Sequence, residues 1–293
     1  MFKSIKKILQ YPRLTFKYPS RPMDSRLFIG KPIINSSKCN CCGECVSRCP
    51  SAAIVLNSVQ EKISAPQDIG VPEDYGFLKA TLDSKDILDL VDIGINLDEC
   101  LFCGLCEEVC KQGAIVMTNE FELAEKERSS LRKKPIIIDE SCFRANSYED
   151  LGVEVEKKIG KIFGRSLQIR EVDAGSCNAC DYEINALNNP FNDIERFGIH
   201  FVASPRHADM LLVTGSATRN MELALIKTYN ATPAPKLVVA VGACACSGGI
   251  FRDNYATRSG IDSIVPVDVY IAGCPPRPQS IMYGILKAID RVK

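Results

Sequence analysis

The sequence predicts an α/β protein in two parts: a small α+β domain, followed by a larger domain built on a doubly wound parallel sheet. A cysteine motif, together with the short apolar segment after it, occurs twice within residues 31–135. From residue 166 onward, short apolar segments alternate with amphipathic ones, as parallel strands joined by helices do. The hydrophobic content of 46% and the charged content of 25% are ordinary for a globular protein.

The composition limits the classes of function. Lys+Arg and Asp+Glu are equal at 36 each, which argues against a nucleic-acid partner because nucleic-acid binders carry a basic excess. The 15 cysteines stand out in a chain of 293 residues with no secretory signal, and we expect thiolate metal ligands rather than disulfides. No apolar run approaches the roughly 20 residues that a membrane span needs.

Residues 1–30 form a basic segment in which the first acidic residue is Asp24. Phe2, Ile5 and Leu9 would fall on one face of a helix. Such a basic amphipathic helix can lie on an anionic membrane or dock on a partner, and a solvated tail is the alternative.

The repeated motif is C-x-x-C-x-x-C-x-x-x-C, and each copy is followed by a similar apolar segment, "SAAIVL" or "QGAIVM". This repetition is the skeleton of a ferredoxin-like domain over residues 31–135 that holds two [4Fe–4S] clusters. Residues 57–97 separate the two copies and contain a turn-rich insertion. From residue 119 the charge density rises, and we expect a helix followed by a solvated connector. A linker is expected over residues 136–165.

Four thiolates at this spacing bind a [4Fe–4S] cube, and the last cysteine of each copy ligates the cluster of the other copy. The first cluster is therefore expected to take Cys39, Cys42, Cys45 and Cys110. The second cluster is expected to take Cys49, Cys100, Cys103 and Cys106. The glycines of "CCGEC" and "FCGLC" allow backbone N–H groups to approach the sulfurs. Zinc or unliganded core cysteine is the alternative, although zinc sites usually come as separated pairs, often with histidine.

The second domain, residues 166–293, has the alternation of a flavodoxin-like sheet. Its expected strands are the apolar segments "SLQIREVD", "MLLVTG", "KLVVAVG" and "VDVYIAG". Its expected helices cover Asn178–Asn188, "RNMELALIKTYN" and "QSIMYGILKAIDRVK". In an open parallel sheet of this kind, ligands bind just beyond the carboxyl ends of the strands.

Cysteines follow three of these expected strands. Cys177 and Cys180 come after the first strand, the pair Cys244 and Cys246 after the third, and Cys274 after the fourth. Because these loops share one edge of the sheet, we expect Cys244 and Cys274 to complete a four-thiolate site with the first pair. No histidine lies nearby in the sequence, which favours a third [4Fe–4S] cluster over zinc. Buried, unliganded cysteines are the alternative.

Residues 170–293 resemble the small, proximal-cluster subunit of membrane-bound energy-converting [NiFe] hydrogenases, including formate hydrogenlyase, and are similar to the 20 kDa subunit of respiratory complex I. The resemblance is carried by "DAGSCNACDYEINAL", "ERFGIHFVASPRHADMLLVTG", "AVGACACSGGIF" and "YIAGCPPRPQSI". Residues 1–135 resemble the two-cluster ferredoxin subunit of the same complexes, through "GKP" before the first motif and "LFCGLCEEVC" and "FELA" around the second. The two subunits are commonly separate chains, and here they would be fused.

The resemblance implies an electron-transfer subunit of an oxidoreductase complex, with three [4Fe–4S] clusters and no catalytic residue of its own. Electrons would pass between a donor protein (ferredoxin, or a formate or CO dehydrogenase) and the Ni–Fe site of a partner large subunit. Membrane-arm subunits would hold the complex at the cytoplasmic membrane, with this chain peripheral on the cytoplasmic side. The C-x-x-C spacing favours this hydrogenase branch, because complex I has adjacent cysteines there. The alternatives are a complex I-like subunit that feeds a quinone site and a soluble ferredoxin-type carrier with a metal-free α/β domain.

The remaining cysteines are assigned partly by the resemblance. Cys244 stands at the G-x-C position that the family uses as a ligand, and Cys246 is the alternative ligand. Cys41 and Cys142 have no partners in these patterns and are expected to be structural.

Three charged or titratable residues also fall in the stretches that carry the resemblance. Glu183 would handle protons near the third cluster, and the alternative is a carboxylate that only complements the helix dipole. Arg206 and His207 would lie near that cluster and raise its potential, and the alternative is a plain salt bridge in a loop.

Overall fold

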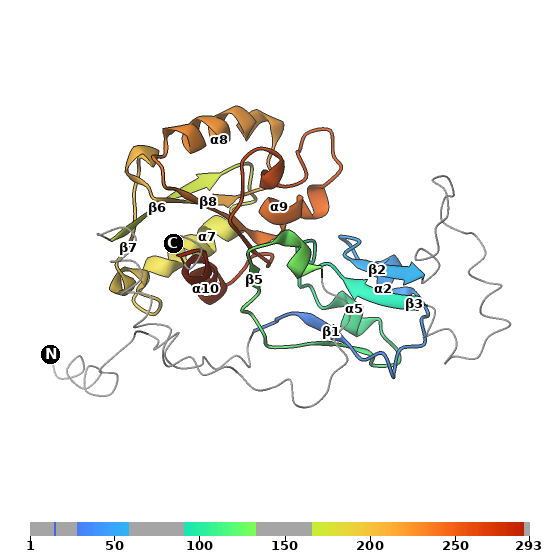
Figure 1. Ribbon diagram of the computed structural model, residues 1–293. Coiled ribbons are helices and arrows are strands. Elements are labelled where there is room, and N and C mark those ends of the chain that lie inside the picture. The colour runs from blue at the N-terminus through green and yellow to red at the C-terminus, as the bar shows by residue number, and fades with distance from the viewer. Residues whose placement is uncertain (1–14, 16–27, 59–90, 133–165, 290–293) are drawn as a thin grey trace, which may run out of the picture.

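The computed structural model describes residues 15, 28–58, 91–132 and 166–289 of the chain. The expected linker, Cys142 and most of the basic segment lie outside the described residues. The described residues form two parts, a larger one and a smaller one, which lie on the left and right of Figure 1. Within these ranges no helix is both long enough and apolar enough to cross a membrane.

The larger part is built on a six-stranded sheet with the strand order β5-β10-β9-β8-β6-β7. The mutually parallel strands are β6 (Leu167–Asp173), β7 (Ile199–Phe201), β8 (Met210–Thr214), β9 (Leu237–Val241) and β10 (Val269–Ile271). In chain order these five strands run 2-1-3-4-5, which is the flavodoxin-like order, and the predicted fold class is confirmed. The order reverses between β6 and β8, and folds of this class bind ligands beside such a point.

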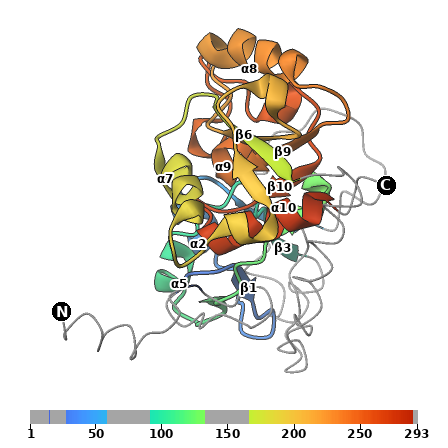
Figure 2. The ribbon, with the colours of Figure 1, turned by 90° about the vertical axis from the view of Figure 1, so that its left-hand side faces the viewer.

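Helices cover both faces of this sheet (Figures 1 and 2). On one face lie α7 (Ala179–Asn185) and α10 (Pro278–Ile289), and on the other lie α8 (Arg219–Ala231) and α9 (Gly242–Ser247). Short 3₁₀ helices occupy the connecting loops: η5 (Ala186–Asn188), η6 (Ile194–Phe197), η7 (Pro205–His207), η8 (Gly249–Phe251) and η9 (Ile261–Ser263).

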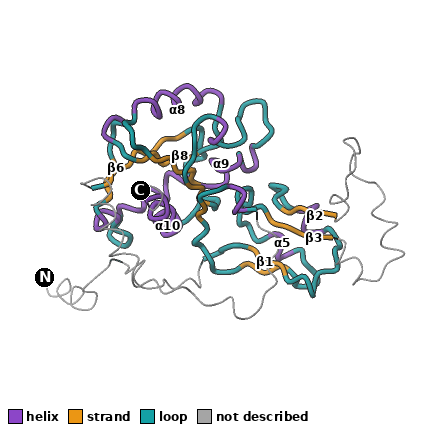
Figure 3. Tube along the Cα trace, viewed as in Figure 1, coloured by secondary structure: helices purple, strands orange, loops and turns teal. Residues whose placement is uncertain are grey.

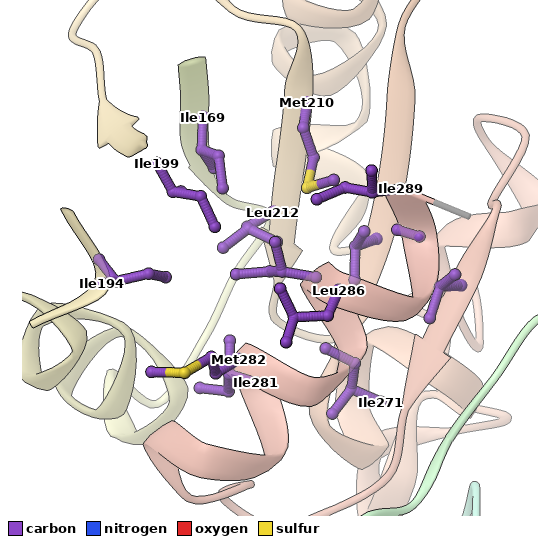
Figure 4. Packing of buried hydrophobic residues seen from close by; sticks show 14 of the residues in the cluster. Ile169, Ile194, Ile199, Met210, Leu212, Ile271, Ile281, Met282, Leu286 and Ile289 are labelled. Carbon is purple, nitrogen blue, oxygen red and sulfur yellow. The ribbon is translucent and has the colours of Figure 1, made fainter. Parts of the chain in front are cut away.

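Each face of the sheet has its own hydrophobic core, because successive residues of a strand point to opposite faces. On β8, Leu212 packs on the side of α7 and α10, whereas Leu211 and Val213 pack on the side of α8 and α9. Figure 4 shows the first core, in which Leu212 lies between Ile169 of β6 and Leu286 of α10. Every residue of β8 is buried, as a strand covered on both faces requires.

The segment after residue 119 differs from the expected helix and solvated connector. It forms β5 (Ala124–Glu125), which pairs antiparallel with β10, and then the 3₁₀ helix η3 (Arg128–Leu131). Leu123 and Leu131 are buried against the core on the side of α8 and α9. The expectation was wrong because these apolar side chains cover the edge of the larger sheet, so the high charge density did not indicate a solvated helix.

The smaller part contains two antiparallel strand pairs. β1 (Pro32–Ile34) pairs with β4 (Ile115–Met117), and β2 (Ile54–Ser58) pairs with β3 (Val91–Ile95). β2 and β4 are the short strands expected after the two cysteine motifs, and each pairs with the strand that precedes the other copy of the motif. Figure 3 shows these short elements joined by loops.

Each cysteine motif also contains one short helix. These are α2 (Glu44–Arg48) and α5 (Leu105–Glu108), which pack against each other. Beneath them, a small core that includes Ile34, Ile54 and Ile95 is buried. The two motifs are therefore held side by side by contacts between their own helices and strands.

Replacing Leu212 by Ala should lower the free energy of unfolding by about 2–5 kcal/mol, because a side chain with no exposed surface leaves the core. The control is Leu223→Ala on α8, where the side chain is 59% exposed and the expected change is within about 0.5 kcal/mol. Urea unfolding followed by circular dichroism measures both variants. Similar losses for the two would contradict the packing described for the sheet.

Candidate functional site

One pocket of the smaller part is lined by the four cysteines expected for the first cluster: Cys39, Cys42, Cys45 and Cys110. The fourth cysteine comes from the second motif, as an exchange of last ligands requires. Burial raises the pKa of Cys45 to about 11, and the neighbouring sulfurs of Cys39 and Cys42 raise it further. Thiolates this close repel one another, and the positive charge of bound iron would remove that repulsion.

A second pocket is lined by the other expected set: Cys49, Cys100, Cys103 and Cys106. Here the exchanged cysteine is Cys49, from the first motif. Burial raises the pKa of Cys100 to about 12, and the sulfurs of Cys106 and Cys49 add to the effect. Apolar side chains such as Ile95 and Phe102 line the same pocket and keep water from the sulfurs.

Backbone N–H groups donate to sulfurs in a matched pattern in the two motifs. The four hydrogen bonds are Cys41 N–H to Cys39 Sγ at 3.4 Å, Phe102 N–H to Cys100 Sγ at 3.3 Å, Ala53 N–H to Cys49 Sγ at 3.3 Å and Ala114 N–H to Cys110 Sγ at 3.2 Å. Such donors stabilise negative charge on sulfur and tune the potential of a bound cluster.

The expected glycines contribute to this pattern indirectly. Gly43 and Gly104 have φ of 77° and 78°, and each begins the short helix of its motif. The donors themselves lie two residues earlier, at Cys41 and Phe102, whose φ values of 52° and 54° are also left-handed. Cys41 therefore serves the first pocket through its backbone N–H.

The third set of cysteines gathers at the carboxyl edge of the larger sheet. Cys177 precedes α7, Cys180 lies on α7, Cys244 lies on α9 and Cys274 follows β10. Burial raises the pKa of Cys180, and the sulfurs of the other three cysteines raise it further. Burial raises the pKa of Cys244 to about 11, again with help from two of these sulfurs. The structure thus brings together the four side chains that the sequence singled out.

Gly242 leaves room for this arrangement. A Cβ atom at this position would lie 2.6 Å from Cys180 Sγ, which is closer than any real contact of that kind. Its φ of +87° is also left-handed, which glycine adopts without strain. The site therefore fits a group held between the ends of β6, β9 and β10 only while residue 242 carries no side chain.

Cys246 lies elsewhere, although it is only two residues from Cys244. It is fully buried in the core between α9 and the sheet, and its thiol contacts the carbonyl oxygens of Ala240 and Ile271 at 3.8 and 3.5 Å. This position favours Cys244 over Cys246 as the third ligand.

The spacing of these cysteines is wider than a single ion needs. Among the described residues, no three His, Cys, Asp or Glu side chains converge closely enough to hold one metal ion. In a [4Fe–4S] cube each cysteine sulfur binds a different iron, so the four sulfurs stand further apart than around zinc. The donor set, which consists of thiols alone, therefore fits an iron–sulfur cube better than zinc.

The three groups of cysteines follow one another in space. The sulfur of Cys106 in the second group is close enough to raise the pKa of Cys45 in the first group. The sulfur of Cys103 in the second group likewise raises the pKa of Cys274 in the third, after burial and Cys177. The second group therefore lies between the other two.

A pair of carboxyl groups, which the sequence reasoning missed, lies beside Cys180. Asp181 accepts hydrogen bonds from Ser176 Oγ at 2.5 Å and Thr214 Oγ1 at 2.8 Å. Burial alone would raise the pKa of Asp181, but these donors lower it below its ordinary value. Glu171 on β6 faces Asp181, and burial, followed by the hydrogen bond and charge of Asp181, raises its pKa to about 7.

The charged residues named in the sequence have different positions. Glu183 is half-buried on α7, and burial raises its pKa although Arg277, 4.0 Å away, opposes the shift. Its expected proton-handling role stays a prediction. Arg206 and His207 lie on η7 just before β8, at the amino edge of the sheet, whereas the cysteines lie at the carboxyl edge. The expectation that these two residues lie near the third group was therefore wrong.

Two family models match the chain. Residues 177–288 match the NADH ubiquinone oxidoreductase, 20 Kd subunit, and residues 38–115 match a 4Fe-4S dicluster domain. A probable membrane-bound hydrogenase subunit (mbhJ) of Pyrococcus furiosus is 47% identical over 142 residues, covering 47% of this chain and 84% of the relative. Formate hydrogenlyase subunit 7 of Escherichia coli is 44% identical over 155 residues, covering 53% and 57%. An NADH-quinone oxidoreductase subunit of Geobacter metallireducens is 50% identical over 113 residues, covering 39% and 66%.

Gly242→Ala should remove iron from the third group and leave the other two groups loaded, because its Cβ would meet Cys180 Sγ. Gly198→Ala is the matched control, since its φ of +70° is also left-handed but nothing lies within 4 Å of the added Cβ. Iron analysis of the purified chains should give about four fewer iron atoms for the first variant. Equal iron contents would contradict the geometry proposed for this group.

The stability of the chain should depend on pH through Glu171. Its pKa rises from 4.5 to about 7 on folding, so the folded state binds more protons than the unfolded chain between these values. The stabilisation that Glu171 gives is full below pH 4.5 and is lost as the pH rises through about 7. Urea midpoints should therefore show Glu171→Gln gaining on the unmodified chain with increasing pH. A constant difference between the two proteins would contradict the raised pKa.

Proposed function

Because the chain belongs to the family of the 20 kDa subunit of NADH–ubiquinone oxidoreductase, we propose that it relays electrons through three [4Fe–4S] clusters to a catalytic site on another subunit. The chain is an iron–sulfur, electron-relay subunit of an oxidoreductase complex, since both family matches and the relatives agree on this. The number of clusters, their ligands and the partners belong to the proposal.

The proposed ligands are the three groups of cysteines. The first cluster takes Cys39, Cys42, Cys45 and Cys110. The second takes Cys49, Cys100, Cys103 and Cys106. The third takes Cys177, Cys180, Cys244 and Cys274. When bound, each cluster accepts and releases single electrons.

The observation that carries the proposal is the order of the three groups. Cys45 and Cys106 bring the first group beside the second, and Cys103 and Cys274 bring the second beside the third. Centres arranged in such a series give electrons a path through the chain. A separate storage or sensing function would not need this order.

The chain's own residues hold and tune these centres. Backbone N–H groups, such as that of Phe102, stabilise the negative charge on the sulfurs. Apolar side chains line the first two pockets and exclude water. At the two ends of the path, Cys42 and Cys177 are exposed, which suits electron entry from one protein and exit to another.

The partner that we propose at the third group is the Ni–Fe large subunit of a membrane-associated hydrogenase. The relatives from Pyrococcus furiosus and Escherichia coli are named as subunits of a membrane-bound hydrogenase and of formate hydrogenlyase. The C-x-x-C spacing of Cys177 and Cys180 supports the same branch. The donor would be a ferredoxin or a formate or CO dehydrogenase. Membrane-arm subunits would keep this peripheral chain at the cytoplasmic face of the membrane.

A complex I-like function is the second candidate, because the NADH-quinone oxidoreductase relative from Geobacter metallireducens is 50% identical over 113 residues. In that case the third cluster would pass electrons to a quinone. Purifying the native complex from membranes separates the candidates, since a hydrogenase must oxidise or evolve H₂ and must contain nickel. Quinone reduction without nickel would select the second candidate.

Cys274→Ala should reduce the iron content from about twelve to about eight atoms per chain, because the third cube loses one thiolate. The EPR signals of the first two clusters should persist while electron transfer to the partner is abolished. Cys246→Ala is the control: Cys246 is a neighbouring cysteine buried in the core, and this variant should keep about twelve iron atoms.

An unmodified chain with about eight iron atoms would overturn the proposal. The larger domain would then hold no metal, as in a soluble ferredoxin-type carrier. Loss of the third cluster in the Cys246 variant, with retention in the Cys274 variant, would overturn the ligand assignment instead.

A further inference from the structure

Two acidic residues directly precede Cys100, the first cysteine of the second motif. Asp98 has no exposed side-chain surface, and the side chain of Glu99 is only 10% exposed. Buried carboxylates destabilise a fold unless cations and hydrogen-bond donors surround them. Their presence next to a proposed cluster ligand indicates that the loop is held firmly in place.

Three arginines surround these carboxylates. Arg128 Nε lies 2.7 Å from Asp98 Oδ2, and Arg132 Nη2 lies 2.9 Å from both Asp98 Oδ2 and Glu99 Oε1. Arg252 Nη1 lies 2.7 Å from Glu99 Oε2. With Asp262, which lies 3.2 Å from Arg128, the network holds three carboxylates and three guanidinium groups and is electrically balanced.

Part of this network crosses between the two parts of the protein. Arg252 follows η8 in the larger part and also donates to the carbonyl oxygen of Ala52, three residues after Cys49, at 3.4 Å. Ser247 Oγ, at the end of α9, donates to the carbonyl oxygen of Asp98 at 2.7 Å. The loop of the second cysteine group is therefore attached to the helix that carries Cys244.

This attachment lies beside the step between the second and third groups, where Cys103 and Cys274 are neighbours. Neither of these two cysteines lies in a long helix or strand that would fix it from within. Electron tunnelling falls steeply with the distance between redox centres. Whatever fixes the separation of these loops therefore governs the rate of this step.

We propose that Glu99 and Arg252 are positioning residues for electron transfer between the second and third clusters, because their ion pair fixes the separation of the loops of Cys103 and Cys274. This inference rests on the proposed electron path. It assigns the pair no contact with a cluster and no role in binding iron.

The test uses the full chain carrying its clusters, with the variants Glu99→Gln and Arg252→Gln and the double variant. Pulsed EPR of the reduced protein measures the magnetic interaction between the second and third clusters, which falls with the cube of their separation. We expect iron content and individual cluster signals to be kept and the interaction to weaken in each single variant. The double variant should be no weaker than the singles, because both act through one contact.

Arg258→Gln is the matched control. Arg258 forms an ion pair with Glu222 at 2.9 Å, within the larger part and away from the junction. Its removal should leave the interaction between the clusters unchanged. If it weakens the interaction as much as Arg252→Gln does, a general loosening of the fold explains the effect and the proposal is overturned.

Two further outcomes overturn the proposal. An undiminished interaction in both single variants, with all iron in place, would show that other contacts fix the separation, while the proposed electron path would stand. Loss of iron from the second or third group in both variants would make the pair structural. An unmodified chain that shows no third cluster in its spectrum would overturn the electron path and, with it, the positioning role.

Discussion

Sulfur atoms from loops far apart in the sequence must meet before a four-cysteine site can bind a cluster, and both parts of the protein satisfy this constraint. In the smaller part the two motifs exchange their last cysteines, so that Cys110 lines the first pocket and Cys49 the second. In the larger part a parallel sheet brings the carboxyl ends of β6, β9 and β10 to one edge. Gly242 then leaves the space that Cys180 occupies. The fold thus serves mainly to place sulfur.

The two parts are joined as closely as their functions require. β5, which follows the second cysteine motif, becomes the antiparallel edge strand of the larger sheet beside β10. Near it, Asp98 and Glu99 form ion pairs that reach Arg252 of the larger part. A hydrophobic seal and a buried ion network therefore act on the same junction. For a protein that passes electrons across this junction, a fixed geometry there matters more than mobility.

The fold class could be predicted because apolar strands buried on both faces leave continuous apolar runs, as in "MLLVTG" for β8. The cysteine groups could be predicted because motif spacing and strand ends specify them locally. β7 is only three residues long and gives no periodic signal, and β5 is formed by pairing with a strand more than 140 residues away. The pair of Glu171 and Asp181 and the ion network of Asp98 depend on contacts between distant segments, which one sequence does not reveal. Arg206 was misplaced because a matching motif does not tell at which end of a strand its loop lies.

The most direct test is an anomalous-scattering map, recorded at the iron absorption edge from crystals of the chain with its clusters. We expect three compact iron sites in series, with the middle one bounded by Cys103 on the side that faces the third. Around the third site the sulfurs should be those of Cys177, Cys180, Cys244 and Cys274. Two iron sites alone, or a third one bound through Cys246 with Cys244 turned away, would contradict this arrangement.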